Sequence, residues 1–271
     1  MTGGDASAAA ALSPLVRRVR APNASLMTGT GTNTYLVAGD GIAVIDPGPD
    51  DARHVAAVLA ATGGRAVRWI LVSHRHVDHA PAAAALARAT GAPVAALAGS
   101  AVPHDRGLRD GETVAGPGYT LQALHTPGHA SDHLCFLLRE ERALFAGDLV
   151  AQGGTVVIAP PDGDMAAYLA SLERVRALDL ARLYPGHGEP VDDPAALLGE
   201  YIEHRLARER QIIAALRGGP RRIEGLVAAI YTEVPQALHP VAAKSVLAHL
   251  LKLRAEGRVA GEEDGVWRLL E

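Results

Sequence analysis

The chain has 271 residues, of which 48% are hydrophobic and 21% charged, and its formal net charge is −4. The length predicts one large domain followed by a small one, and the composition excludes a chain that is disordered throughout. The negative charge gives no overall attraction to phosphate backbones or anionic lipid, so any nucleic-acid binding would be local. No run of 18 apolar residues is present, which excludes a membrane-spanning helix.

The first part of the chain predicts alternating strands and helices. Two β-rich runs, Thr32–Val37 and Ile42–Ile45, flank a glycine-rich turn and predict a hairpin. The elements predicted after them are a helix over Asp51–Ala61, a strand over Val67–Val72, a helix over Ala80–Thr90, strands over Pro93–Leu97, Tyr119–Leu124, Asp132–Leu138 and Ala143–Phe145, a helix over Met165–Ala177 and a short strand at Leu183-Tyr184. This order predicts a layered α/β domain over residues 1–194, with helices covering sheets.

The last part of the chain, residues 195–271, predicts a small helical domain. Helices are expected over Ala195–Leu216, Ile223–Ile230 and Pro240–Glu256, followed by a hairpin from Arg258–Ala260 to Val266–Leu269. Three helices followed by a two-stranded hairpin is the order of a winged helix.

The single cysteine bears on the expected compartment. Cys135 cannot form an intramolecular disulfide, and it lies inside an apolar strand, where it is expected to pack in the core. The first twelve residues lack the basic segment of a secretory signal. We therefore expect a cytoplasmic protein.

One short loop carries the strongest chemical signal. Three histidines and an aspartate, His74, His76, Asp78 and His79, occur within six positions directly after a buried strand. Neutral imidazole and carboxylate are ligands for Zn²⁺, Mn²⁺ or Fe. An irregular loop can direct His74 and His76 to one ion and Asp78 and His79 to another. The alternative is a polar loop that contains these histidines by chance. Three histidines and an aspartate within six positions make this alternative improbable.

Three further loops place a glycine directly before a possible ligand. They read Gly128-His129, Gly147-Asp148 and Gly186-His187, and each follows a predicted strand. Glycine lets the backbone turn sharply where a side chain must point inward. No G-x-S-x-G motif is present, which disfavours a serine nucleophile.

These motifs resemble those of the metallo-β-lactamase superfamily over roughly Asn33–Gly188. The resemblance implies an αββα sandwich of two facing sheets with a dinuclear centre, expected to hold two Zn²⁺, with Mn²⁺ or Fe as alternatives. It also implies the ligands: His74, His76 and His129 on the first metal, Asp78, His79 and His187 on the second, and Asp148 bridging both. A metal-bound hydroxide would then attack an ester-like or phosphodiester bond, with Asp78 as the catalytic residue that orients it.

Within the superfamily, the chain is most similar to the β-lactamase-like-protein-2 family. The similarity rests on Gly31–Leu36, on Pro160–Tyr168 and on the predicted winged helix around Ala237–Val259. Cleavage of single-stranded RNA has been ascribed to an animal member of that family, which makes single-stranded RNA one expected substrate.

Other functions stay open at this point. The first alternative is a small-molecule thioester or lactone hydrolase of the glyoxalase II type. Residues 196–271 carry 11 Lys/Arg and 10 Asp/Glu, a net charge of +1, and the rest of the chain therefore has a net charge of −5. Neither part is strongly basic, which favours this alternative over a nuclease. Weak β-lactamase activity could accompany either the RNA-cleaving or the thioester/lactone-cleaving activity. A DNA-binding ligand sensor is disfavoured, because sensing needs no complete set of seven ligands. A homodimer is a further expectation.

Three residues outside the ligand set are assigned expected roles. Asp164 and Tyr168, in the segment that leads into a helix after Asp148, are expected on the substrate side of the site. Asp46 is expected to accept a hydrogen bond from a metal-binding histidine.

Overall fold

The computed structural model describes residues 9–270, which form two compact units. One unit comprises the chain up to Thr126, Asp132–Gly154 and Leu178–Pro194, and the other comprises Pro127–Ser131, Thr155–Ala177 and the chain from Ala195 onward. Among the described residues, no helix combines the length and the apolar character needed to cross a bilayer.

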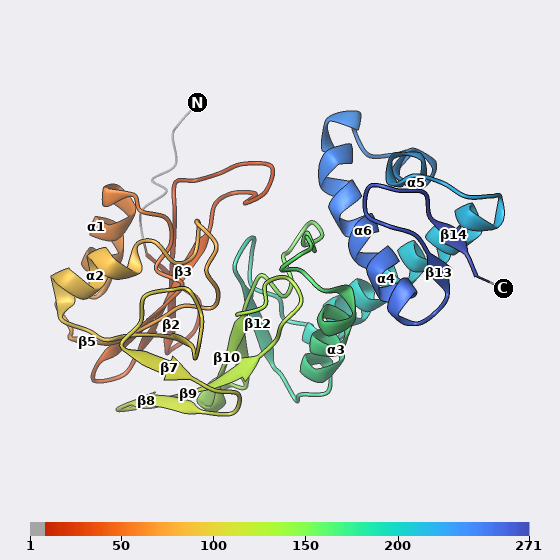
Figure 1. Ribbon diagram of the computed structural model, residues 1–271. Coiled ribbons are helices and arrows are strands. Elements are labelled where there is room, and N and C mark those ends of the chain that lie inside the picture. Colours follow the sequence, from red (N-terminus) through yellow and green to blue (C-terminus); the bar gives the residue numbers. More distant parts are fainter. Residues whose placement is uncertain (1–8, 271) are drawn as a thin grey trace. The chain divides into compact units, whose positions relative to one another are not determined.

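A seven-stranded sheet is the first layer of the first unit (Figure 1). Its strands, in spatial and chain order, are β1 (Ala10–Ala11), β2 (Val16–Arg20), β3 (Asn33–Ala38), β4 (Ile42–Ile45), β5 (Val67–Leu71), β6 (Val94–Leu97) and β7 (Arg106–Leu108). The strands pair antiparallel as far as β4 and parallel from β4 to β7. Helices α1 (Ala52–Ala61) and α2 (Ala83–Thr90) pack on one face, burying Val58 and Leu86 against Ile70.

A five-stranded sheet is the second layer of this unit. Its strands are, in spatial order, β12 (Arg182–Pro185), β11 (Ala143–Gly147), β10 (Leu134–Leu138), β9 (Tyr119–His125) and β8 (Thr113–Gly116), with the 3-10 helix η1 (Arg139–Glu141) after β10. The core between the two sheets includes Tyr35, Phe145 and Tyr184, whose ring centroids lie 5.1–5.4 Å apart. Alternate residues of facing strands thus supply one apolar layer, as two-sheet packing requires.

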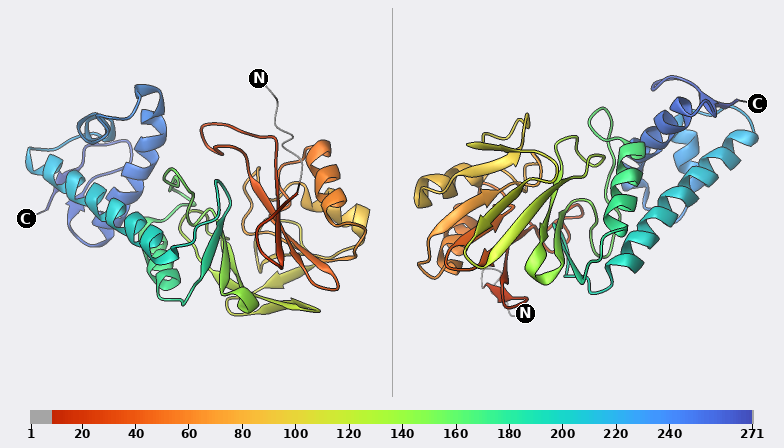
Figure 2. Two further views of the ribbon diagram at one scale, coloured as in Figure 1. Left: turned by 180° about the vertical axis from the view of Figure 1, so that it is seen from behind. Right: turned by 90° about the horizontal axis from the view of Figure 1, so that it is seen from below.

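The second unit is mainly helical (Figure 2). Its elements are α3 (Met165–Arg176), α4 (Pro194–Arg217), α5 (Ile223–Ile230), the 3-10 helix η2 (Gln236–Leu238), α6 (His239–Ala255) and the hairpin of β13 (Val259–Ala260) and β14 (Arg268–Leu269). A separate core joins the second half of α4 to α5, α6 and the hairpin, and Trp267 is buried in it. This arrangement is a winged helix.

The structure confirms the predicted α/β class and the predicted winged helix. The division into ranges 1–194 and 195–271 stays a prediction. Four strands were not expected from the sequence, namely β1, β2, β7 and β8. Buried and exposed residues do not alternate strictly in β2, so it lacks the period of two that predicts a strand. β8 is an edge strand of only four residues, with Val114 as its one buried side chain, and is too short for its alternation to predict a strand.

Candidate metal centre

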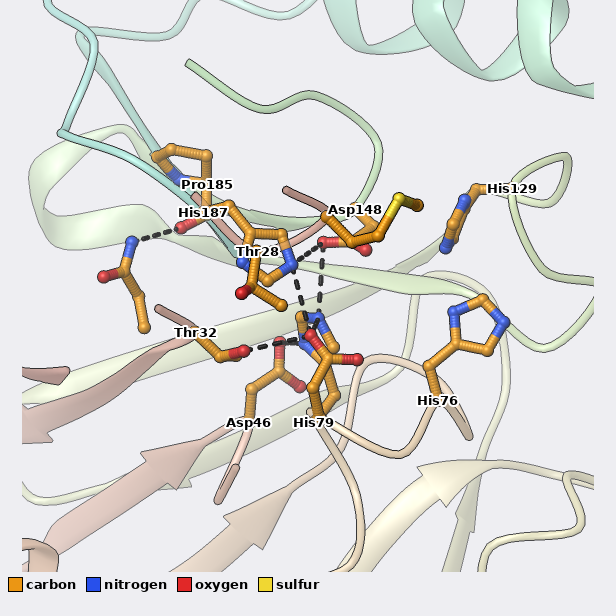
Figure 3. Close-up of polar contacts among 12 residues, drawn as sticks. Thr28, Thr32, Asp46, His76, His79, His129, Asp148, Pro185 and His187 are labelled. Atoms are coloured by element: carbon orange, nitrogen blue, oxygen red, sulfur yellow. Dashed lines mark hydrogen bonds and ion pairs between the residues drawn. The ribbon is translucent and has the colours of Figure 1, made fainter. Parts of the chain in front are cut away.

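The candidate ligands lie on loops that follow strands (Figure 3). The loop after β5 carries His74, His76, Asp78 and His79. The ends of β11 and β12 lead into Asp148 and His187, and His129 lies between β9 and β10. The regular strands fix where each loop starts, while the irregular backbone beyond them lets side chains of different loops meet.

The structure brings all seven predicted ligands together in two groups. His74, His76, His129 and Asp148 form the first group, and Asp78, His79 and His187 form the second. Within each group, the possible ligand atoms lie within 4.8 Å of one another. Three imidazoles with a carboxylate, and two imidazoles with a carboxylate, are donor sets suited to divalent transition metals.

Asp148 faces both groups through different oxygens. Its Oδ1 lies 3.3 Å from Nε2 of His79 and 3.3 Å from Nε2 of His187. Its Oδ2 lies 3.9 Å from Nε2 of His74, in the first group. A carboxylate placed in this way can bridge two cations.

The Asp46 carboxylate orients the loop that carries His79. It is 2% exposed, and its Oδ2 lies 3.0 Å from Nδ1 of His79, as the sequence predicted. Its Oδ1 and Oδ2 also accept hydrogen bonds from the backbone and hydroxyl of Ser73. The Asp46 backbone has φ 51°, a left-handed conformation that is uncommon outside glycine and that tends to occur at functional sites.

His133 supports Asp148 from the backbone side. Its Nε2 accepts a hydrogen bond from the Asp148 N–H at 3.0 Å, so its Nδ1 carries the proton and donates to Thr126 Oγ1 at 2.8 Å. The ring is fully buried. The position of His133, four residues after His129, was the signal in the sequence that it lies near the candidate ligands.

The segment before β3 fixes the side chain of Asp78 by a hydrogen bond. Thr32 Oγ1 donates to Asp78 Oδ2 at 2.9 Å, and Thr32 itself is held by two hydrogen bonds with the Asn23 side chain. Nothing in the sequence around Asn23 and Thr32 signals this contact, because the residues lie more than 40 positions before Asp78 and belong to no ligand motif.

A glycine is required where the loops approach the ligands most closely. A Cβ on Gly186 would lie 2.6 Å from Asp148 Oδ1 and 2.8 Å from His79 Cε1. Gly147 has φ +47°, and a Cβ there would lie 2.6 Å from His133 Nε2. The glycines before the predicted ligands thus make room for the centre as well as turning the chain.

The charges of the site also fit divalent cations. Burial alone would raise the pKa of Asp148, but His79 and His187 outweigh it and hold that pKa well below its usual range. Burial alone would lower the pKa of His187, but hydrogen bonds to Asp148 and Asp78 raise it to about 9. Burial alone would also raise the pKa of Asp78, but hydrogen bonds from His187 and His79 hold that pKa below its usual range. Both carboxylates therefore stay charged, and either protons or cations must neutralise them.

His79 provides a direct test of this fit. Its Nδ1 is bound to Asp46, while its buried Nε2 makes no hydrogen bond within residues 9–270 and points between the carboxylates of Asp78 and Asp148, at 3.4 and 3.3 Å. Metal-bound histidines are oriented in this way, with the second ring nitrogen on a carboxylate.

Cation binding should depend on pH through His187. Because its pKa is about 9 without a bound cation, a proton must leave the imidazole when a cation binds at lower pH. The association constant should therefore rise about tenfold per pH unit between roughly pH 6 and 9 for each proton released. Chelator competition at pH 6, 7 and 8 measures this slope, and an affinity independent of pH would contradict the ligand role of His187.

The Asp46→Asn substitution should weaken cation binding without removing a ligand. The amide keeps the size of the carboxylate but loses the charge that favours His79 as a donor, so we expect affinity to fall about 10- to 100-fold. Isothermal titration with Zn²⁺ measures the change, and Asp51→Asn, at the half-buried N-cap of α1, is the matched control. An unchanged affinity would mean that Asp46 has only a structural role.

The two residues expected on the substrate side have clear structural positions. Asp164 is the N-cap of α3, where its side chain accepts a hydrogen bond from the Ala167 N–H. Tyr168 is fully buried, with the Arg205 guanidinium 5.3 Å from its ring centroid. Both positions are explained by the packing of the second unit, and their part in substrate binding stays a prediction.

Similarity to known proteins agrees with this geometry. A family model described as the metallo-beta-lactamase superfamily matches residues 27–187, and one described as the beta-lactamase associated winged helix domain matches residues 223–267. A Beta-lactamase domain protein from Burkholderia ambifaria has a TM-score of 0.87 at 21% identity, covering 99% of this chain and 95% of that one. This last likeness bears on the fold alone.

Three curated relatives are similar over most of their length. Lactamase-like protein vrtG of Penicillium aethiopicum is 38% identical, and the match covers 94% of this chain and 85% of the relative. An atrochrysone carboxyl ACP thioesterase of Aspergillus chevalieri is 36% identical with the same coverage. A Beta-lactamase-like protein 2 homolog of Caenorhabditis elegans is 33% identical over 92% of this chain and 87% of the relative. Together with the seven clustered His and Asp side chains, these matches show that the chain belongs to the metallo-β-lactamase superfamily, in the group that carries a C-terminal winged helix.

Proposed function

We propose that the chain is a dinuclear metal-dependent hydrolase that cleaves thioesters of apolar acyl groups. The observation that carries the dinuclear part is the position of Asp148, whose two oxygens face the two ligand groups separately. His74, His76 and His129 would hold one cation, Asp78, His79 and His187 the other, and Asp148 both. When bound, the cations supply Lewis-acid chemistry, which acidifies water and stabilises negative charge on the oxygen of the scissile bond. Zn²⁺ is the proposed metal.

Asp78 is the residue of the second group that a substrate or water can reach. Its side chain is 20% exposed, against 0% for His79 and 9% for His187. Thr32 fixes one of its oxygens by a hydrogen bond of 2.9 Å. We therefore assign Asp78 to orient the attacking water, with Thr32 and Asn23 as positioning residues.

Exposed apolar side chains occur close in sequence to these residues and favour an apolar substrate. Leu26 is 88% exposed and Met27 is 59% exposed, both in the turn between Ser25 and Gly29, and Val77 is 81% exposed between two ligand positions. The turn is fixed by hydrogen bonds from Ser25 and Thr28, and Thr28 Oγ1 donates to the Asn23 carbonyl. Since Asn23 also binds Thr32, the apolar turn is connected to the Asp78 side of the site.

Two observations favour a thioester over RNA. Apolar side chains supply little binding energy to a phosphate backbone, which is bound mainly by Lys and Arg. Two relatives, 36% and 34% identical, are named atrochrysone carboxyl ACP thioesterases. The second candidate substrate remains single-stranded RNA, in keeping with the winged helix and with the likeness to the β-lactamase-like-protein-2 group.

The test compares both substrates on one preparation. The zinc-loaded chain is given an aromatic acyl thioester of N-acetylcysteamine, with thiol release followed by colour, and in parallel a labelled single-stranded RNA. We expect thiol release that is lost in His76→Ala, and a several-fold higher KM with little change in kcat for Leu26→Ser/Met27→Ser. RNA cleavage without thiol release would overturn the thioester proposal in favour of the nuclease.

A further inference from the structure

The second unit contains a cluster of basic and imidazole side chains between α4 and α6. Arg205 is 2% exposed and His249 is fully buried, and both lie one helical turn before the ion pair of Glu209 on α4 with Lys252 on α6. Arg208 lies three positions after Arg205 and four positions after His204, so on the surface of α4 it is a neighbour of both. We refer to Arg205, Arg208, His204 and His249 as the α4–α6 basic cluster.

The two arginines of this cluster have no acidic partner within residues 9–270. The Arg205 guanidinium donates to the Val156 carbonyl and lies 5.3 Å from the ring centroid of Tyr168. The Arg208 guanidinium donates to the Ile230 carbonyl at 3.1 Å and to Oε1 of Gln211 at 2.9 Å, and it lies 4.3 Å from the ring centroid of Tyr231. In each arginine, the buried Nε makes no hydrogen bond.

The nearby carboxylates are already matched by other cations. Glu209 accepts from Lys252 at 2.7 Å and from Arg258 at 2.8 Å. Glu256 accepts from the same two cations, at 2.7 and 3.3 Å. Two carboxylates thus balance Lys252 and Arg258, and the charges of Arg205 and Arg208 are left over.

The histidines add hydrogen-bonding capacity without adding charge. Neither ring nitrogen of His249 has a hydrogen-bond partner in the described chain, and Nδ1 of His204 has none either. Burial, followed by the charges of Arg205, Lys252, His204 and Arg208, lowers the pKa of His249 to about 3. The neutral ring can therefore donate one N–H hydrogen bond at neutral pH.

We propose that the α4–α6 basic cluster binds an oxyanion, a phosphate or a carboxylate. Leaving a buried charge unpaired costs several kcal/mol, and guanidinium groups match the oxygens of phosphate and carboxylate in geometry as well as charge. An anion would compensate the two arginines and accept from the buried nitrogen atoms that now lack acceptors. None of the four residues of this cluster is a candidate metal ligand, so anion binding can be measured with the metal centre disabled.

The test measures anion binding to the full chain with the metal centre controlled. The His76→Ala chain treated with chelator serves as background, because inorganic phosphate also binds metal ions. Isothermal titration is carried out with inorganic phosphate, acetate and glycerol 3-phosphate at constant ionic strength. Arg205→Gln and Arg208→Gln are compared with Arg210→Gln, which replaces an exposed arginine paired with Glu203.

We expect saturable binding of at least one anion, weakened tenfold or more by Arg205→Gln or Arg208→Gln and unchanged by Arg210→Gln. Binding of inorganic phosphate identifies a free oxyanion, and binding of glycerol 3-phosphate alone identifies a phosphate group on a larger ligand. No saturable binding, or binding that both cluster variants retain in full, would overturn the proposal. If Arg205→Gln does not fold, the anion affinity of Arg208→Gln decides whether the cluster binds an anion, because that variant keeps the more deeply buried Arg205.

Discussion

Asp148→Asn should lower the rate of thioester hydrolysis by about a thousandfold at saturating substrate. The amide has one oxygen instead of two equivalent charged ones, so it cannot serve both ligand groups as the Asp148 carboxylate does at 3.3 and 3.9 Å. Stabilisation of charge by a metal ion contributes several kcal/mol to a transition state, and each 1.36 kcal/mol is tenfold in rate. The measurement is kcat with metal in excess.

The control for this substitution is Asp105→Asn. Asp105 is also an aspartate of the first unit, where its carboxylate accepts a hydrogen bond from the Val94 N–H. Asp105→Asn should keep a kcat close to that of the parent. A rate in Asp148→Asn within tenfold of the parent, with the fold intact, would show that Asp148 does not join the two ligand groups.

Trp267→Ala should destabilise the winged helix by about 3–5 kcal/mol. The indole is fully buried between α6 and the hairpin, and a Cβ on Gly261 would lie 2.6 Å from its ring. The small core of the winged helix has little stability to lose, so we expect the winged helix of Trp267→Ala to be largely unfolded at 37 °C. Hydrogen exchange of the α5 and α6 amides measures the change.

Trp267→Phe separates packing from hydrogen bonding in this core. The indole Nε1 makes no hydrogen bond within the described residues, so phenylalanine should restore most of the protection. Val266→Ala, at a neighbouring position that is 50% exposed, should have little effect. Equal protection of α6 in Trp267→Ala and in the parent would contradict the assignment of Trp267 to this core.

The clustering of the seven candidate ligands could be predicted from the sequence because their signal is local. His74, His76, Asp78 and His79 lie within six positions, and the other three each follow a glycine at the end of a strand. These features are set by metal chemistry and by the turn of the backbone, and both are visible in short stretches of sequence. The strands that carry the loops were also predicted, since their apolar runs are strong.

The residues that hold the ligands were harder to predict, because their contacts are long-range. Thr32 meets Asp78 across 46 positions, and Asp46 meets His79 across 33. Asp46 was predicted because a carboxylate beside a metal-bound histidine is a general rule, whereas a threonine hydroxyl has many partners in any fold. Strand β2 was missed because Val16 and Val19, its buried residues, are three positions apart.

A metal titration of the chelator-treated full chain, with thiol release measured at each step, tests directly whether the centre is dinuclear. We expect two equivalents of Zn²⁺ to bind per chain and thioester hydrolysis to reach its maximum only with the second. Binding of a single equivalent at saturation, or full hydrolysis by the metal-free chain, would contradict a dinuclear centre joined by Asp148.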